Sequence, residues 1–469
     1  MPALDAKAIL EGRRPGRRSV GLTIGIVVSV LCMLAMFGYL LWSGLASGGV
    51  AGVVGFVISL LAAIIPVAIL VPLILALDRL EPEPGMVLTF AFLWGAGVAV
   101  VVSFILNTAG MAFVTVPAFG ESLGDFISTA VGAPVVEESA KGLVLLILLW
   151  RRRHELDSLT DGVIYAAMVA TGFAFTENIL YFLSSYLSEG AFGLGFTFVL
   201  RGLIAPFGHP LYTAMIGIGV AYAAINRGGG RMLAPVLGWF GAVVLHGLWN
   251  ASTAFGWLGF GVAYIVLFFV LVSIIVLAVQ DRRKHVAAIA HFLPPYVSTG
   301  LVTPADVRML SSIPGRRGAR SWAQRNAGQR GRNAMKDYQL AATELALLHQ
   351  RLARGVARPN WEERRDNFLA LMHAARTAFL GHVQQPVAPA WASAPTDSGF
   401  LQRADFEHVI ARAQQQRAAQ PQQPGPGGPP PGGPPQGPPP QGPPPQAPPP
   451  NPGQQPPYPP HQSGPGRSW

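Results

Sequence analysis

Four apolar segments that follow one another along the chain each contain polar groups suited to acid–base or metal chemistry. An ionisable side chain inside a membrane-spanning helix costs about 2.5 to 3.5 kcal/mol or more, so such groups usually face a polar interior and have a function there. The groups are Glu137, Glu138 and Lys141 in the first segment, Phe173, Glu177 and Asn178 in the second, His209 in the third, and His246 and Asn250 in the fourth.

The depth of these groups in their helices can be calculated from the helical rise of about 1.5 Å per residue. Glu137 and Glu177 then lie roughly 15 Å from the outer ends of their helices, and His209 and His246 lie roughly 10 Å from theirs. We therefore expect the four side chains to meet around a water-accessible cavity in the outer half of the membrane.

The pair Glu137-Glu138 is followed by Lys141, which is four residues after the first carboxylate and three after the second. This spacing puts Lys141 within reach of either one on a helix. We expect one carboxylate to pair with Lys141 and the other to face the cavity. There it can act as a general base that takes a proton from water and returns it to a leaving amine. The alternative reading is a buried ion pair that fixes helix packing.

The two histidines suit several roles. His246 and Asn250 are four residues apart, so they share a helix face and can act as paired ligands or as donors to a developing oxyanion. His209 lies between Gly208 and Pro210, where a helix starts or breaks. Taken singly, each imidazole could be a packing residue, and Glu177 alone could be a proton-relay group.

Two versions of water activation remain open. In a metal version, Glu177, His209 and His246 bind a divalent ion such as zinc, a ligand set that leaves one position for water. In a glutamic version, a desolvated carboxylate and an imidazole suffice without an ion. The sequence does not choose between them, because it lacks the His-Glu-x-x-His signature of many zinc proteases.

Composition indicates that these segments lie in a membrane. The 469 residues are 51% hydrophobic and only 12% charged, whereas soluble domains carry about 25% charged residues, so a purely soluble enzyme is excluded. The single cysteine, Cys32, excludes an intramolecular disulfide and a cysteine-based metal site. About eight runs are long and apolar enough to span a bilayer. They are approximately Val20 to Leu45, Val50 to Leu77, Met86 to Leu106, Phe126 to Trp150, Gly162 to Leu187, Leu203 to Ile225, Met232 to Ser252 and Phe255 to Val279.

The basic residues set the expected orientation, because they favour cytoplasmic loops. Basic tracts such as Arg151-Arg152-Arg153 and Arg282-Arg283-Lys284 fall on one side, while a loop on the other side holds Glu189 and Arg201. This pattern predicts a multi-pass protein of the cell (plasma) membrane with both termini cytoplasmic. The net charge of +10 does not indicate nucleic-acid binding, because most Lys and Arg residues follow Gln280.

The expected organisation is an all-α polytopic membrane protein with four parts. They are a basic arm (1–19), a transmembrane protease-like domain (20–280), a cytoplasmic helical region (281–418) and a disordered tail rich in Pro, Gly and Gln (419–469). The tail could engage a cytoplasmic proline-reading partner, although a solubilising role is the simpler reading.

Within the helical region, apolar residues recur at steps of three or four, which predicts two amphipathic helices. The repeating positions are Tyr338, Ala342, Leu345, Leu348 and Leu352, and then Trp361, Phe368, Leu371, Ala375 and Phe379. A helical hairpin is the expected arrangement, with a membrane-surface or partner-binding helix as the alternative.

The ordered set of motifs resembles the PrsW-like intramembrane proteases, within the superfamily of CAAX-processing and bacteriocin-processing membrane endopeptidases. The motifs are Glu137-Glu138-x-x-Lys141, Phe173-x-x-x-Glu177-Asn178, His209 and His246-x-x-x-Asn250, with a similar tract at Asp78-Arg79. The resemblance covers roughly residues 50 to 280.

The resemblance implies hydrolysis of peptide bonds in membrane-anchored proteins within the lipid bilayer, with an anti-sigma factor in stress signalling as the best-known family substrate. Asn250 stands where the family can have Asp, which removes one possible anionic ligand. A proton- or cation-coupled transport protein using the same buried Glu and His residues is the alternative. Against it, the spans show no inverted repeat. A third reading is a scaffold whose C-terminal region recruits partners.

Overall fold

The computed structural model describes residues 6, 20–77, 83–153, 156–226, 228–355 and 360–380. Within these ranges the chain is helical and contains no strand, which confirms the all-α class. Residues 381–418 and the predicted tail 419–469 lie outside the described residues. So do most of the arm before Val20 and the tract from Asp78 to Pro82.

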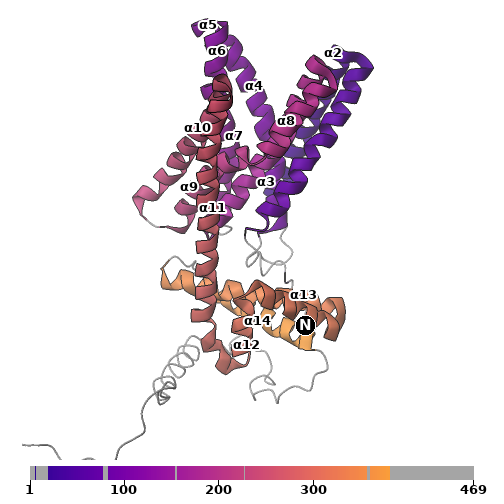
Figure 1. The fold of residues 1–469 in the computed structure, drawn as a ribbon. Helices are drawn as coiled ribbons and strands as arrows, with labels where there is room; N and C mark the ends of the chain where they lie inside the picture. The colour runs from indigo at the N-terminus through magenta and orange to yellow at the C-terminus, as the bar shows by residue number, and fades with distance from the viewer. Residues whose placement is uncertain are drawn as a thin grey trace, which may run out of the picture. The chain divides into compact units, whose positions relative to one another are not determined.

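The helices follow one another with few breaks (Figure 1). The apolar part contains α2 (Val20–Ile74), α3 (Gly85–Leu93), α4 (Val100–Gly110), α5 (Val116–Phe119), α6 (Glu121–Ile127), α7 (Ala133–Arg151), α8 (Leu159–Phe198), α9 (Gly208–Ile225), α10 (Leu233–Ser252) and α11 (Gly256–Phe292). It also contains the π-helical turns η1 (Trp94–Ala99), η2 (Met111–Thr115), η3 (Ser128–Gly132) and η5 (Val199–Ile204), and the 3-10 turns η6 (Gly229–Met232) and η7 (Thr253–Phe255). The C-terminal helices are η8 (Pro294–Thr299), α12 (Pro304–Leu310), α13 (Ile313–Ala353) and α14 (Trp361–Leu380).

Four helical stretches of the described chain are long and apolar enough to cross a membrane: Val20–Ile74, Gly85–Phe119, Leu159–Ile225 and Gly229–Phe292. The first of them reverses at Gly49, whose φ of 58° and ψ of −138° suit only a residue without a side chain. Beyond the reversal, a Cβ on Gly52 would lie 1.9 Å from the carbonyl oxygen of Gly44. Thus α2 is a tight helical hairpin. The total of eight crossings stays a prediction.

A second reversal lies inside α8, at Gly190 (φ 68°, ψ −151°). The hydroxyls of Ser185 and Thr197 are 2.8 Å apart across it. The loop expected between Leu187 and Leu203 is therefore wrong, because residues 191–204 are helical and end in the π turn η5. The segment is apolar, but its glycines and one arginine interrupt the run that the sequence pattern requires.

Close backbone crossings hold the long helix α8 against its neighbours. A Cβ on Gly172 would lie 1.9 Å from the carbonyl oxygen of Phe92, and a Cβ on Gly162 would lie 2.1 Å from that of Gly217. Small residues allow such contacts between membrane helices, where packing replaces the hydrophobic effect. Helix α8, which carries Glu177, is consequently in close backbone contact with α3 and with α9, which carries His209.

The start of α8 is fixed by polar contacts. Ser158 and Asp161 form a reciprocal capping box at its first turn, which satisfies backbone N–H groups that a helix leaves unpaired. Asp281 on α11 accepts hydrogen bonds from the backbone N–H of Thr160 at 3.2 Å and from its hydroxyl at 3.1 Å. These contacts fix the position of α8 along its axis relative to α11. Glu177 lies on the same helix, so its position is fixed as well.

The apolar helices present large hydrophobic side chains on their outer surface, as lipid-facing helices do. Among the exposed ones are Leu31, Trp42, Phe113, Phe192, Leu237, Trp257, Leu258 and Phe269. Polar groups are found inside instead, including Glu137, Glu138, Lys141 and His246, each at most 5% exposed. This inversion of the usual soluble pattern supports the membrane assignment of the bundle.

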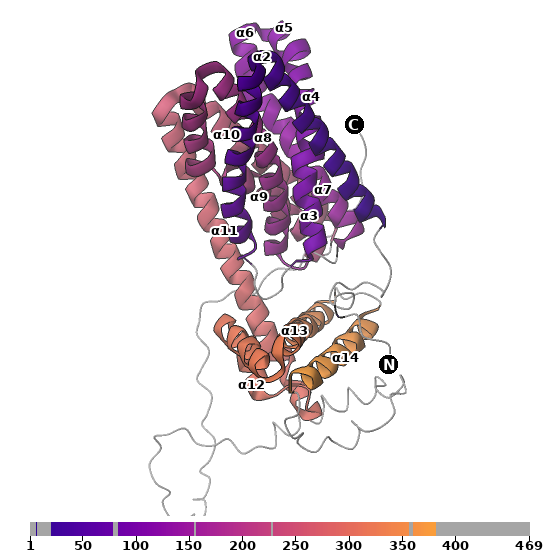
Figure 2. The ribbon, with the colours of Figure 1, turned by 90° about the vertical axis from the view of Figure 1, so that its right-hand side faces the viewer.

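The C-terminal helices form a second apolar core. The helix α11 continues from the apolar run to Phe292, past the boundary expected near residue 280. Next, α13 and α14 lie side by side (Figure 2). Tyr338, Leu345 and Phe368 are fully buried, as the amphipathic pattern predicts, whereas Leu352 is 37% exposed.

Candidate active site

The carboxylates Glu137 and Glu138 sit one turn into α7, and Lys141 follows on the same helix. The Lys141 Nζ atom lies 3.3 Å from Glu137 Oε2 and 2.9 Å from Glu138 Oε1. The expectation that only one carboxylate would pair with Lys141 is wrong. The reason is that an ammonium group has three donors and the spacing of three and four residues puts both acceptors within reach.

Lys141 also joins α7 to α9. Its Nζ atom is 3.1 Å from His209 Nδ1 and stands 3.8 Å from the centroid of the Phe173 ring. Since an ammonium can only donate, Nδ1 of His209 must accept, and the ring proton must be on Nε2. That Nε2–H points at Glu177 Oε2, 2.9 Å away.

His246 has a matching arrangement on α10. Its Nδ1 atom is 3.1 Å from Glu138 Oε1, and its Nε2 atom is 3.9 Å from Glu137 Oε2. The second oxygen of Glu138 accepts a hydrogen bond from the Thr213 hydroxyl at 2.8 Å. Glu138 is therefore fully engaged and orients His246 so that Nε2 faces Glu137.

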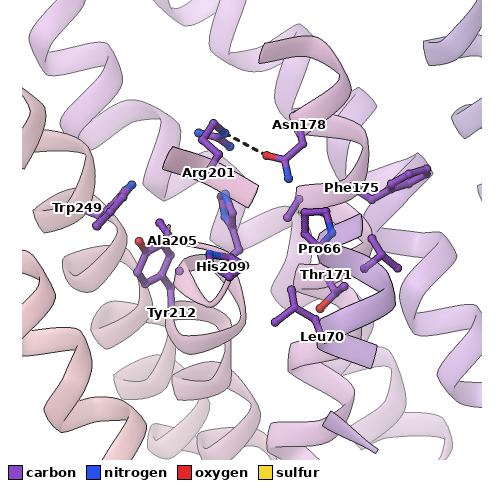
Figure 3. Close-up of a pocket in the computed structure, with 14 residues that line it drawn as sticks. Pro66, Leu70, Thr171, Phe175, Asn178, Arg201, Ala205, His209, Tyr212 and Trp249 are labelled. Atoms are coloured by element: carbon purple, nitrogen blue, oxygen red, sulfur yellow. Dashed lines mark hydrogen bonds between the residues drawn. The ribbon is translucent and has the colours of Figure 1, made fainter. Parts of the chain in front are cut away.

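The carboxylate of Glu177 accepts a hydrogen bond from a residue that does not belong to any of the motifs. Arg201, on the π turn η5, donates through Nη2 to Glu177 Oε2 at 2.5 Å. Its Nε atom donates to Asn178 Oδ1 at 3.0 Å (Figure 3). Its guanidinium carbon also lies 4.0 Å from the centroid of the Tyr181 ring. Arg201 thus fixes the carboxylate that orients His209.

Asn250 does not take part in this network in the way the spacing suggests. Its side-chain amide donates to the backbone carbonyl of Thr129 at 2.9 Å and so links α10 to η3. The remaining predicted residues lie together: Glu137, Glu138, Lys141, Phe173, Glu177, His209 and His246, with Asn178 joined through Arg201.

Hydrogen bonds with α4 and η1 support the helices that carry the cluster. Asn107 on α4 donates to Glu137 Oε1 at 3.3 Å. The indole N–H of Trp94 donates to the carbonyl of Ala140 at 3.0 Å, and the hydroxyl of Thr176 donates to the carbonyl of Ala96 at 2.8 Å. Trp94 and Ala96 belong to the π turn η1, and π turns free backbone groups that a regular helix would use.

A pocket reaches the cluster from the side of α2 and η5 (Figure 3). About 470 Å³ of space not filled by atoms lies within its bounds, a volume that includes space open to the surroundings. Its walls are mainly apolar, with a few polar groups, as is usual for ligand sites. The polar lining residues are Thr171, Asn178, Arg201, His209 and Tyr212.

The three residues Glu137, His209 and His246 offer ligand atoms that lie within 4.8 Å of one another. Zinc binds such atoms at about 2.0 to 2.2 Å, so two ligands of one ion lie at most about 4.4 Å apart, and only a small closure is needed. Each imidazole already has its other nitrogen against a carboxylate, the usual support for a metal-binding histidine. The residues fit a divalent ion, with Glu137 in the place expected for Glu177.

Comparisons with known proteins agree with this geometry. The family model described as PrsW family intramembrane metalloprotease matches residues 83–277. Residues 83–277, the PrsW-like region, are similar to this family, which confirms the resemblance of the motifs. The PrsW-like region contains the whole cluster and also Arg201, while the part of α2 that lines the pocket lies outside it. Together with the apolar helices, the family identifies a membrane protein.

Three curated relatives, each named Protease PrsW, are similar to this chain. The protein of Clostridioides difficile is 36% identical over 121 residues, which cover 26% of this chain and 49% of the relative. Those of Geobacillus kaustophilus and Bacillus subtilis are 28% and 29% identical over 32% and 27% of this chain, and 60% and 54% of their own lengths. The chain thus spans about half the length of the relatives it matches, and no solved structure matches it.

Proposed function

We propose that the chain is an intramembrane endopeptidase that hydrolyses peptide bonds of membrane-anchored proteins. The single observation that carries this proposal is the convergence of Glu137, Glu138, Lys141, His209 and His246 on one buried point. The Nδ1 atom of His209 accepts from Lys141, which also pairs with Glu137, and the Nε2 atom of His246 faces Glu137 at 3.9 Å, so both imidazoles lie around this carboxylate. The family and its relatives give the class of reaction.

Each residue receives a role from its contacts. Glu137, His209 and His246 would hold a divalent ion such as zinc, which would supply a Lewis acid that polarises the scissile carbonyl. Glu138 orients His246 through Nδ1, and Glu177 orients His209 through Nε2. Lys141 balances the charge of the paired carboxylates.

The same groups can move the proton that hydrolysis requires. In the version without an ion, a water between Glu137 and His246, whose Oε2 and Nε2 atoms are 3.9 Å apart, gives its proton to the carboxylate as it attacks. As the C–N bond breaks, the carboxylic acid acts as a general acid and returns the proton to the leaving amine. Asn250 keeps a proposed supporting role through the contact between α10 and η3.

The charge of the cluster supports a cation there. The three carboxylates Glu137, Glu138 and Glu177 face the two cations Lys141 and Arg201, which leaves one net negative charge when both imidazoles are neutral. The ammonium of Lys141 bonds to His209 Nδ1 and so fills part of the space that a bound ion would take.

The proposed topology has eight crossings, with both termini in the cytoplasm. The reversals at Gly49 and Gly190 support it, because each divides a long helical stretch into antiparallel parts. The substrate is a single-span protein, with an anti-sigma-like regulator as one candidate class. A proline-reading partner of the tail is a separate proposal.

The test is a comparison of membrane proteomes from cells that produce the wild type or the Glu137→Gln/Glu138→Gln variant at equal levels. A fragment of a membrane protein that appears only with the wild type identifies both the activity and the substrate. Identical fragment patterns, with the wild-type protein present in the membrane, would exclude the proposal.

A further inference from the structure

The phenol of Tyr212 on α9 is buried, with 1% of the residue exposed, yet its hydroxyl has no hydrogen-bond partner among the described residues. Buried hydroxyls nearly always have a partner, and one that lacks it calls for an explanation. A bound molecule that supplies an acceptor is one such explanation. The position of the hydroxyl shows which molecule that would be.

Tyr212 lies between the reactive cluster and the pocket. Its ring stacks on His246, with centroids 4.9 Å apart and an interplanar angle of 20°, and meets His209 edge-on at 5.8 Å. It also lines the pocket that reaches His209 (Figure 3). A peptide bond placed beside the two imidazoles would therefore lie close to the phenol.

The hydroxyl itself is at the corner where the chain enters α9. A Cβ on Gly208 would lie 2.8 Å from Tyr212 Oη, so the lack of a side chain at this position makes room for the phenol tip. In Figure 3 the oxygen points toward the side of the pocket where Ala205 lies. The O–H group thus lies beside Gly208 at the first turn of α9, on a side chain that lines the pocket.

Other candidate donors near the pocket are already used. The amide of Asn250 donates to the carbonyl of Thr129. Arg201 donates to Glu177 and Asn178, and the hydroxyl of Thr213 donates to Glu138. Tyr212 is a buried neutral donor of the pocket lining that these contacts leave available.

We infer that Tyr212 is a catalytic residue whose O–H group donates a hydrogen bond to the carbonyl oxygen of the scissile peptide bond. The inference rests on the proposed endopeptidase function. When the oxygen of water bonds to the carbonyl carbon, the π electron pair moves onto the carbonyl oxygen, and the phenol stabilises the resulting oxyanion while keeping its own proton. The C–N bond then breaks, and the amine leaves with the proton taken from water.

The test is the variant Tyr212→Phe, which removes only the oxygen and keeps the ring stacked on His246. With a single-span fluorogenic substrate cleaved by the wild type, kcat is expected to fall about 10²-fold, the usual effect of losing one oxyanion donor, while KM changes less than about 2-fold. The melting temperature is expected to stay the same or rise, because the hydroxyl has no partner to lose.

The chain offers a matched control in Tyr264 on α11. Its hydroxyl is also buried without a partner among the described residues, but it does not line the pocket. Tyr264→Phe is expected to keep wild-type kcat. Equal losses in both variants would overturn the inference, because they would show a general effect of removing a buried hydroxyl.

Two further outcomes separate this inference from the function on which it rests. If Tyr212→Phe cleaves normally while Glu138→Gln is inactive, the endopeptidase proposal stands and the role of Tyr212 is refuted. If neither Tyr212→Phe nor Glu138→Gln changes cleavage, the cleavage does not come from this cluster, and both proposals are refuted. A fall in kcat that comes with a lower melting temperature would assign Tyr212 a structural role and also overturn the inference.

Discussion

The membrane helices and the C-terminal helices both contain ionisable groups, but they place them differently. In the C-terminal helices, ion pairs lie at the edge of an apolar core: Arg376 on α14 and Asp306 on α12 are 2.8 Å apart, with side chains 22% and 21% exposed. In the bundle, Glu138 and Lys141 pair at 2.9 Å with side chains 0% exposed. The first arrangement is what folding alone requires. The second encloses charge at a cost, which indicates chemistry.

The acceptors of buried cations differ in the same way. Arg316 on α13 is only 3% exposed, and it donates to the carbonyl of Leu310 and the hydroxyl of Thr343. These neutral acceptors are fixed parts of the fold. Lys141 instead faces two carboxylates and the acceptor nitrogen of His209. Among the described residues, the bundle thus places a fully buried cation against two buried carboxylates and an imidazole.

Removal of metal should give the largest difference between the two regions. A chelator is expected to reduce cleavage to background and added zinc to restore it, because Glu137, His209 and His246 form the candidate ligand set. Metal analysis of the purified protein should find about one ion, lost in His246→Ala and kept in His349→Ala, which changes a histidine of α13. Full activity in protein shown to be free of metal would eliminate the metal version and leave the glutamic one.

Glu138→Gln should lower kcat/KM by about 10³-fold, within the range that acid–base groups contribute. In the wild type, the Glu138 carboxylate neutralises the charge of Lys141 and orients His246. The neutral amide of Gln cannot do both. The matched control is Glu344→Gln on α13, whose carboxylate lies 3.7 Å from Arg364 and 3.9 Å from Arg351. Because such partly exposed pairs contribute under about 1 kcal/mol, the control should cleave normally. Similar losses of cleavage in both variants would show that the ionisable groups of the two regions do not differ in their importance for cleavage.

Phe368→Ala should lower the stability of the C-terminal helices and leave cleavage nearly unchanged. This side chain of α14 is fully buried, and its truncation is expected to lower the free energy of unfolding of the C-terminal helices by about 3 to 5 kcal/mol. Hydrogen exchange of α13 and α14 measures this effect, while cleavage should change less than about 3-fold. Leu352→Ala, at a position 37% exposed, should have little effect on either. Loss of cleavage in proportion to unfolding would show that the bundle depends on these helices.

The sequence predicts the members of each region better than their partners. Periodicity identifies the buried residues Tyr338, Leu345 and Phe368, because amphipathic helices bury one face whatever they pack against. Matching depth along the helices identifies Glu137 and His246 as residues that could meet. Both inferences use only distances along a helix.

Partners across helices need tertiary information. Arg201 was expected in a loop, and Tyr212 and Thr213 belong to no motif, since their roles depend on how η5 and α9 pack against α7, α8 and α10. Asn250 shares a face with His246 but reaches Thr129 instead, because η3 lies nearer. The sequence does contain one signal of the two chain reversals. The spacing Gly-x-x-Gly begins at Gly49 and again at Gly190, where the chain reverses.

The smallest expected effect is the pH dependence of the C-terminal helices. His349 is hydrogen-bonded to the Tyr296 hydroxyl at 2.7 Å. Burial, and then the charge of Arg365, lowers the pKa of His349 from its usual 6.5 to about 4. Below pH 6.5 the unfolded state therefore takes up the proton first. The stability that His349 contributes is complete above pH 6.5 and is lost as the pH falls toward 4.

Urea unfolding at pH 7 and at pH 4.5 measures this contribution. The wild type should be more stable than His349→Gln at pH 7, and the difference should shrink at pH 4.5. A difference that is the same at both values would contradict the assignment. Cleavage by the bundle at pH 7 should be equal in the two proteins.

The central claim is that the buried cluster of α7, α8, α9 and α10 directs water onto a peptide bond. The most direct measurement is cleavage of a single-span substrate in vesicles prepared with ¹⁸O-labelled water, followed by mass spectrometry of the fragments. The wild type should release a fragment whose new C-terminal carboxylate carries ¹⁸O, and Glu137→Gln/Glu138→Gln should release none. A fragment without the label, or equal labelled product from the double variant, would contradict the account.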